Sequence, residues 1–359
     1  MTKEFHATAF RPPTLTKLRL YKSYISGWLP VFMTNSVGVA EIWLFDLFCG
    51  PGCDRDGEKG SPLILLDELT KYLNFRSTRN PPKINILFND RKKWKIEQLK
   101  GYIKSRSPLP RIVSIHFTSK SYFEIFPDVA DVATRRDTAC FIFIDQCGIN
   151  AIGDDFLKQL ASFPITDWLA FVASSQARRF IKHKNLAIHL DKKGAWRDAH
   201  RTVADTCRTI IGDPEYYLVP FSIKHLCNIH GLLFGSHHPS GADKFINACW
   251  TEDRNAGEAN FDIDGKVQNS SRMLKLIPSK KLDAFEAEFR GRIIAGAITN
   301  TKEAYTFALQ SGVKASHAKD VLKIMKKEGL ISSVPALSYS TTIAKRGVKP
   351  ITLVRETIL

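Results

Sequence analysis

The feature that most constrains the fold is a series of short, mainly apolar runs that alternate with helical stretches. The first four runs are Glu41–Asp46, Lys83–Asn89, Arg111–Phe117 and Ala139–Ile144, and a fifth follows at Asp167–Ala173. Apolar runs of this length are too short to span a bilayer and are typical of buried strands. Their alternation with helices indicates a mainly parallel sheet with helices on both faces.

The two ends of this pattern complete the expected domain. An amphipathic helix is expected at Leu15–Phe32, before the first run. Two later runs, Tyr216–Phe221 and Asn228–Phe234, follow each other without room for a long helix between them. We therefore predict an α/β fold for residues 1–276, with a doubly wound, mainly parallel, Rossmann-like sheet of seven strands and an N-terminal helix.

The charge of the chain indicates a polyanionic partner. The sequence has 52 Lys and Arg against 36 Asp and Glu, a formal net charge of +16. The excess is clustered, because Ser270–Leu359 alone holds 16 basic and 7 acidic residues, a net +9. Basic side chains neutralise phosphates and release counterions, so DNA or RNA is the expected partner. A merely soluble basic protein is the alternative.

Cysteine usage and the N-terminus indicate the compartment. The chain has seven Cys, an odd number, and no Cys-x-x-Cys pair, so neither a disulfide framework nor a zinc ribbon is expected. Residues Met1–Lys17 lack the apolar core of a signal peptide. A reducing cytoplasm is the expected location.

The candidate binding motif follows the first run. The segment Asp46-Leu-Phe-Cys-Gly50-Pro-Gly52 places an acid before two glycines, which let a backbone approach a ligand closely. Asn89 and Asp90 end the second run, where nucleotide-binding sheets often hold ribose hydroxyls. A tight turn that binds no ligand is the alternative.

Several segments together resemble the three-Cys-motif partner family. They are Asp46–Gly52, Gly60-Ser-Pro-Leu63, and Phe143-Ile-Asp145 with Gly148. The resemblance spans the chain from about Thr14 onward and implies the class I methyltransferase fold with S-adenosylmethionine as cofactor. It also implies a partner protein that carries a three-cysteine, radical-type iron–sulfur motif.

The resemblance implies roles for individual residues. Asp46, Phe48, Gly50 and Gly52 would line the methionine and ribose portions of the cofactor. Asn89 or Asp90 would take the ribose hydroxyls, and Thr118 and Ser119 would flank the adenine, where an Asp is expected instead. After the fourth run the family has Asp-Pro-aromatic-Gly, whereas this chain has Asp145-Gln146-Cys147-Gly148.

Asp145 and Gln146 are the candidate catalytic residues. Asp145 follows the most apolar run, so its carboxylate is expected at the cleft, where it can accept a proton or hydrogen bond from the attacking group. Gln146 can present its amide to a base edge. Asp145 as a turn residue is the alternative, and Cys147 is more simply a buried apolar side chain than a nucleophile. No metal site is expected.

Two basic segments are candidate nucleic-acid contacts. Arg178, Arg179 and Lys182 interleave with aromatic residues, a pattern that suits single-stranded or flipped nucleic acid, although a solvated helix face is the alternative. Residues 277–359 are predicted to form a winged-helix domain. Its helices are expected at Ala284–Ile298, Thr301–Gln310 and Lys314–Glu328, and its wing at Ser338–Ala344 and Pro350–Val354.

The nucleic-acid contacts expected in that domain are four basic residues: Lys319, Lys323, Lys345 and Arg346. Winged helices also dock proteins, which is the alternative role. The sequence thus predicts a methyltransferase that acts on nucleic acid. A catalytically silent adaptor that keeps the fold and binds nucleic acid or a protein is the rival hypothesis.

Overall fold

The computed structural model describes residues 9–34, 38–75, 81–145, 153–172, 199–225, 228–254, 257, 259–260, 280–338 and 347–354. The chain divides into two compact units, Met1–His237 and His238–Leu359. The proposed winged-helix segment, residues 277–359, lies wholly within the second unit. Within the described ranges, no helix combines the length and the apolar character that crossing a membrane requires.

The first unit is built on a mostly parallel sheet. Its strands are β1 (Glu41–Asp46), β2 (Lys83–Asn89), β3 (Val113–Thr118), β4 (Thr138–Ile144), β5 (Thr166–Val172), β6 (Tyr217–His225) and β7 (Asn228–Ser236). They run in the order β3-β2-β1-β4-β5-β7-β6. Strands β1 to β5 pair in parallel, while β7 is antiparallel to both β5 and β6. The predicted mainly parallel sheet is confirmed, with these seven strands contributed by the described residues of the first unit, and the predicted closing pair is the β6–β7 hairpin.

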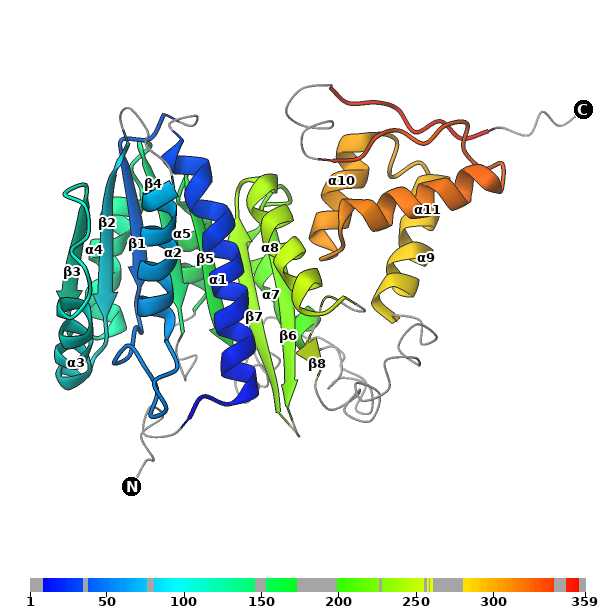
Figure 1. Ribbon diagram of the computed structural model, residues 1–359. Coiled ribbons are helices and arrows are strands. Elements are labelled where there is room, and N and C mark those ends of the chain that lie inside the picture. Colours follow the sequence, from blue (N-terminus) through cyan, green and yellow to red (C-terminus); the bar gives the residue numbers. More distant parts are fainter. Residues whose placement is uncertain are drawn as a thin grey trace, which may run out of the picture. The chain divides into compact units, whose positions relative to one another are not determined.

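Helices cover both faces of this sheet. They are α1 (Pro12–Met33), α2 (Ser61–Phe75), α3 (Lys93–Lys104), α4 (Tyr122–Ala133), α5 (Asp154–Ser162) and α7 (Ala199–Ile211). Figure 1 shows α1 and α2 in front of the sheet, with α4, α5 and α7 behind it. The rear helices share one buried core with β1, β4 and β5, which includes Ile125, Leu157 and Trp168. All seven residues of β4 are buried, as expected for a strand covered on both sides.

An aromatic stripe fixes α1 to the sheet. The Tyr21 ring lies 4.5 Å from Phe143, and the Tyr24 ring lies 4.8 Å from Phe234, measured between centroids. The polar ends of this stripe are satisfied, because the Tyr24 hydroxyl and the Trp28 indole N–H both donate to the Asp167 carboxylate, at 2.6 and 3.0 Å. Burying large rings with their polar atoms bonded stabilises the docked helix.

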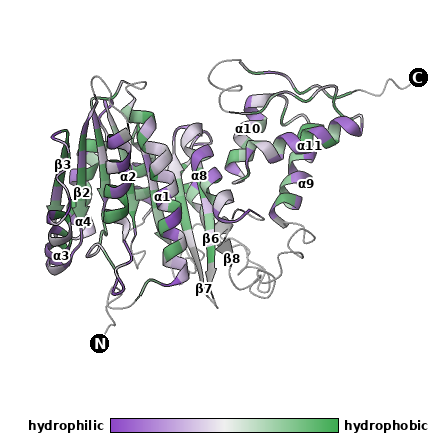
Figure 2. Ribbon diagram, in the orientation of Figure 1, coloured by the Kyte–Doolittle hydropathy of each residue, from purple (hydrophilic) through white to green (hydrophobic). Residues whose placement is uncertain are grey.

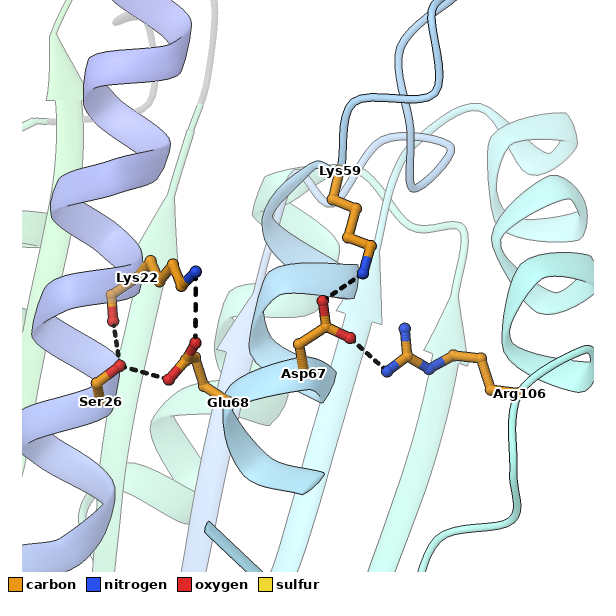
Figure 3. Close-up of polar contacts among 6 residues, drawn as sticks. All are labelled: Lys22, Ser26, Lys59, Asp67, Glu68 and Arg106. Atoms are coloured by element: carbon orange, nitrogen blue, oxygen red, sulfur yellow. Dashed lines mark hydrogen bonds and ion pairs between the residues drawn. The ribbon is translucent and has the colours of Figure 1, made fainter. Parts of the chain in front are cut away.

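Helix α2 is held on two sides (Figure 3). On the α1 side, the Ser26 hydroxyl donates to Glu68 at 2.6 Å. On the other side, the Asp67 carboxylate accepts from Lys59 at 2.7 Å and from Arg106 at 2.5 Å. These contacts fix the position of α2 and, with it, the end of the turn that leads from β1 into α2.

The second unit is mainly helical. It contains α8 (Pro239–Glu252), β8 (Ala259–Asn260), α9 (Lys280–Ile294), α10 (Thr301–Gln310) and α11 (Ala315–Lys327). Hydrophilic and hydrophobic stretches alternate along α9, α10 and α11 in Figure 2, as in amphipathic helices that share a core. The predicted apolar face of α11 is buried: Ala318, Val321, Leu322 and Met325. Helix α9 ends earlier than predicted because Gly296, with φ of 73°, terminates it.

Trp250 on α8 anchors the turn between α10 and α11. Its indole N–H donates to the Gly312 carbonyl at 3.0 Å, and its ring lies 4.3 Å from that of His317. Helix α8 thus belongs to the same core as the three helices predicted for this unit. Backbone hydrogen bonds join residues 349–354 to the chain at the start of α10 and to the chain after α11, including Ile351 N–H to Thr299 O at 2.7 Å. Most of the first arm of the wing lies outside the described residues, so the wing stays a prediction.

Candidate functional site

The turn after β1 begins the candidate site. Gly50 and Gly52 have φ of 66° and 102°, in the left-handed region that favours glycine. The loop then folds back on itself. The backbone of Cys53 pairs with that of Lys59 in an antiparallel β-bridge, and the Gly60 N–H donates to the Gly52 carbonyl at 2.7 Å. A Cβ on Gly52 would lie 3.1 Å from Leu99 on α3. Backbone conformation and helix packing therefore both favour glycine at position 52, and the close approach of a ligand to this turn stays a prediction.

Asp46 holds this turn from within. Its side chain is fully buried, where Oδ2 accepts from the Ser61 hydroxyl at 2.6 Å and Oδ1 accepts from the Phe48 N–H at 3.3 Å. The pKa of Asp46 is raised to about 7, mainly by burial and also by the nearby Asp145, while hydrogen bonds from Ser61 and Phe48 and the charge of Lys17 oppose the shift. Asp46 is therefore poised to change its charge near neutral pH.

Lys17 on α1 reaches the end of β4, where it forms an ion pair with Asp145. The lysine side chain is only 4% exposed and that of Asp145 is 21% exposed. The ammonium also lies 4.7 Å from the centroid of the Phe171 ring on β5. Lys17 was missed from the sequence, although it falls on the apolar stripe of α1 with Tyr21, four residues on. A lysine on a buried helix face is the signal that would have found it.

The end of β2 carries two polar residues with different roles. The Asn89 amide donates to the carbonyls of Leu47 and Lys120, both at 3.1 Å. Its oxygen accepts from the Thr118 hydroxyl at 2.6 Å and from the Lys120 N–H at 3.0 Å. All the bonds expected of one side-chain amide are thus used within the protein.

Asp90 uses fewer of its hydrogen-bonding sites within the protein than Asn89 does. Its Oδ1 accepts from the Lys92 N–H at 2.9 Å, and its Oδ2 accepts from Lys95 at 3.2 Å. A carboxylate has about four lone-pair sites, so each oxygen retains room for one more donor. Of the two residues expected to hold ribose hydroxyls, the geometry favours Asp90.

Other predicted contacts fall around this edge of the sheet. The Phe48 ring stacks on Tyr122 of α4, at 5.9 Å between centroids, and so packs on the rear core. Ser119 is exposed beyond the end of β3. In the second unit, Lys323 is exposed and pairs with Asp320 at 2.7 Å, while Lys319 is half-buried.

The remaining predicted site residues lie outside the described residues: Gln146, Arg178, Arg179, Lys182, Lys345 and Arg346. Cys147 is outside them too. Cys49 and Cys53 are buried thiols, and burial raises the pKa of each, with help from Asp46 at Cys49 and from Asp54 at Cys53. A raised pKa disfavours the thiolate, the nucleophilic form of cysteine. In the described part of the chain, no cluster of His, Cys, Asp and Glu has the arrangement of a metal site.

Comparison with known proteins yields structural likenesses only. No protein family model and no curated protein matches the sequence. Trm1 from Pyrococcus horikoshii, solved in complex with S-adenosyl-L-methionine, aligns over 98% of this chain and 94% of its own, with 8% identity and a TM-score of 0.39.

Two other solved structures align over a smaller share of the chain. The O-methyltransferase TomG from Streptomyces achromogenes, also in complex with SAM, covers 63% of this chain and 90% of its own, at 10% identity and a TM-score of 0.31. A duf574 family protein from Streptomyces avermitilis covers 61% and 83%, at 10% identity and a TM-score of 0.29. At these TM-scores the likenesses carry no argument about function, so the chemistry of the site has to be inferred from its own side chains.

Proposed function

We propose that this chain is an S-adenosylmethionine-dependent methyltransferase that acts on nucleic acid. The observation that carries the proposal is the convergence of three carboxylates, Asp46, Asp90 and Asp145, at the carboxyl ends of β1, β2 and β4. These strands are neighbours in the sheet, and open α/β sheets bind their ligands at this edge.

The residues present fit such a cofactor. Asp90 has lone pairs left for two ribose hydroxyls. Gly50 has no Cβ, so the backbone of the turn could approach the cofactor closely. Asp46 would hold the turn in shape through Ser61 and Phe48. When bound, S-adenosylmethionine supplies the electrophilic methyl group.

The Lys17–Asp145 pair would position the acceptor. Methyl transfer is a displacement whose main demand is alignment of the reacting groups. Asp145 would accept a hydrogen bond from the acceptor's amine or hydroxyl, and Lys17 would hold that carboxylate in place. The rest of the acceptor would be held by basic residues, in line with the net charge of +16.

A catalytically silent adaptor is the second candidate. The observation that favours it is the same ion pair, because Lys17 already balances the charge of Asp145 without any ligand. The resemblance to the three-Cys-motif partner family adds a further proposal, a partner protein with an iron–sulfur motif that is needed for activity. The winged-helix role proposed for residues 277–359 would be to deliver nucleic acid.

Calorimetric titration with S-adenosylmethionine tests the proposal. We expect binding by the wild type and a loss of at least about tenfold in affinity for Asp90→Asn, since hydrogen bonds to charged groups contribute about 1.5–3 kcal/mol. Asp131→Asn, at an exposed carboxylate on α4, is the matched control and should bind normally. No binding by the wild type at millimolar cofactor would leave the adaptor role. Binding without radiolabel transfer to DNA or RNA would call for the partner protein to be added.

A further inference from the structure

Three aromatic side chains of α3 and α4, in the first unit, are exposed. Trp94 is 43% exposed, Tyr102 is 37% exposed and Phe123 is 68% exposed. The other large apolar residues that are exposed in the described ranges are aliphatic and lie in the second unit, such as Ile294. Tyr102 packs beside Gly52, and the Phe123 ring meets the Tyr122 ring edge-on, at 5.7 Å between centroids. Trp94 and Phe123 nevertheless keep much of their ring surface exposed.

These two rings lie at the same edge of the sheet. Trp94 is the second residue of α3, which follows β2, and Phe123 is the second residue of α4, which follows β3. Strands β2 and β3 are parallel neighbours, so both helices begin at the carboxyl edge. An electrostatic interaction also relates the two helix starts. The pKa of Glu124 on α4 is lowered mainly by the Ser121 hydroxyl, and Arg91, just before α3, contributes to the lowering.

Positive charge accompanies the rings. Arg91, Lys92 and Lys93 are three consecutive exposed cations before Trp94. Lys95 extends this charge toward the end of β2, since its ammonium lies 6.0 Å from the Trp94 ring centroid and 3.2 Å from Asp90 Oδ2. We call Arg91, Lys92, Lys93, Trp94 and Phe123 the α3–α4 surface.

We propose that the α3–α4 surface binds single-stranded nucleic acid, with backbone phosphates on Arg91, Lys92 and Lys93 and unpaired bases stacked on Trp94 and Phe123. Aromatic faces beside cations match this ligand, because a stacked base needs an exposed ring and the backbone needs a cation nearby. A duplex would satisfy the cations and leave both rings unused. The proposal rests on the proposed function only for the role of nucleic acid as acceptor.

The rings are tested with a short fluorescein-labelled oligothymidine and the matching oligouridine, by anisotropy at low salt. Trp94→Ala and Phe123→Ala should each weaken binding by about 5- to 100-fold, the range for one lost stacked base. Trp94→Phe should keep the affinity within a few-fold. Unlabelled oligonucleotide should quench the tryptophan emission of the wild type, and Trp94→Phe should lose most of that quench. Ile294→Ala, at an exposed aliphatic residue of the second unit, is the control for lost apolar surface.

The cations are tested by the salt dependence of the same binding. Changing Arg91, Lys92 and Lys93 together to Ala should reduce the slope of log affinity against log salt by about 2 to 3. Lys71→Ala, at an exposed lysine on α2, should leave the slope unchanged. Thermal midpoints of all variants should match the wild type, because the changed side chains are exposed.

Three outcomes would overturn the proposal. One is a wild type that does not bind either oligonucleotide. Another is wild-type affinity in Trp94→Ala, Phe123→Ala and the triple variant. The third is loss of S-adenosylmethionine affinity in these variants with oligonucleotide binding intact, which would make the surface part of the cofactor site. Selective loss of oligonucleotide binding in a protein that never binds the cofactor would support the surface and reject the methyltransferase.

Discussion

Lys17 and Asp145, which lie 128 residues apart in the chain, form a partly buried ion pair at the carboxyl end of β4. The pair links α1, which covers the front of the sheet, to the strand end where the acceptor is expected. It also lies near Asp46, whose pKa responds to both partners. The charge state of Asp46 therefore depends on residues from two other segments of the chain.

Lys17→Met should destabilise the first unit. Removing the ammonium leaves Asp145 without its partner, and breaking a buried pair typically costs about 3–5 kcal/mol. We expect about 3 kcal/mol by urea denaturation, because Asp145 is partly exposed. Replacing both residues, as Lys17→Met with Asp145→Leu, should restore most of the loss. Equal destabilisation of the single and double variants would show that the pair itself is not what stabilises the fold.

Asp46→Asn should change how stability depends on pH. Folding raises the pKa of Asp46 from 3.8 to about 7, so the folded protein favours the protonated acid. The stability this group contributes is fully present below about pH 4 and is lost as the pH rises through 7. Asparagine cannot ionise, so the free energy of unfolding of Asp46→Asn should gain on the wild type by up to about 4 kcal/mol between pH 4 and pH 8. A difference that stays constant with pH would contradict the shift.

Asp145→Asn should separate positioning from folding. If the carboxylate orients the acceptor, cofactor affinity should stay within a few-fold while methyl transfer per folded molecule falls by about 10²–10⁴. The variant also removes the partner of Lys17, so its thermal midpoint should fall. Radiolabel transfer must therefore be measured well below that midpoint. A normal rate per folded molecule would make Asp145 a structural residue.

Gly52→Ala should destabilise the protein through its backbone. The φ of 102° is unfavourable for alanine, and its Cβ would lie 3.1 Å from Leu99 and 3.2 Å from Tyr102. Strain of this kind costs about 1–3 kcal/mol. Gly101→Ala is the control on α3, where no atom lies within 4 Å of the added Cβ, and it should stabilise by up to about 1 kcal/mol. Thermal denaturation of the two variants should move in opposite directions.

The sheet could be predicted because its strands are continuous apolar runs with polar ends. Strands β1 and β2 have the predicted bounds, and the others differ by a few residues at their ends. Helix α2 was harder, since its Leu63–Leu66 run is apolar on every side and does not distinguish a helix from a buried strand. Helix α5 was not predicted because its nine residues give only a short helical pattern, and α8 was not predicted either.

The carboxylates of the site could be predicted and their environment could not. Asp46, Asp90 and Asp145 follow from their places at strand ends. Whether such a group is free or engaged depends on which distant segment reaches it, as Lys17 reaches Asp145. The same limit applied to Asn89, whose role depends on where the loops after β1 and β3 run.

The four hydrogen bonds of Asn89 have a consequence for the cost of binding. One amide joins the loop after β1, through Leu47, to the end of β3, through Thr118, and to the loop after it, through Lys120. The spacing between these loops is thus set when the protein folds. A ligand that contacts both would pay little conformational entropy to order them, so more of its contact energy would appear as affinity. Asn89 would in this way preorganise this edge of the sheet before a ligand binds.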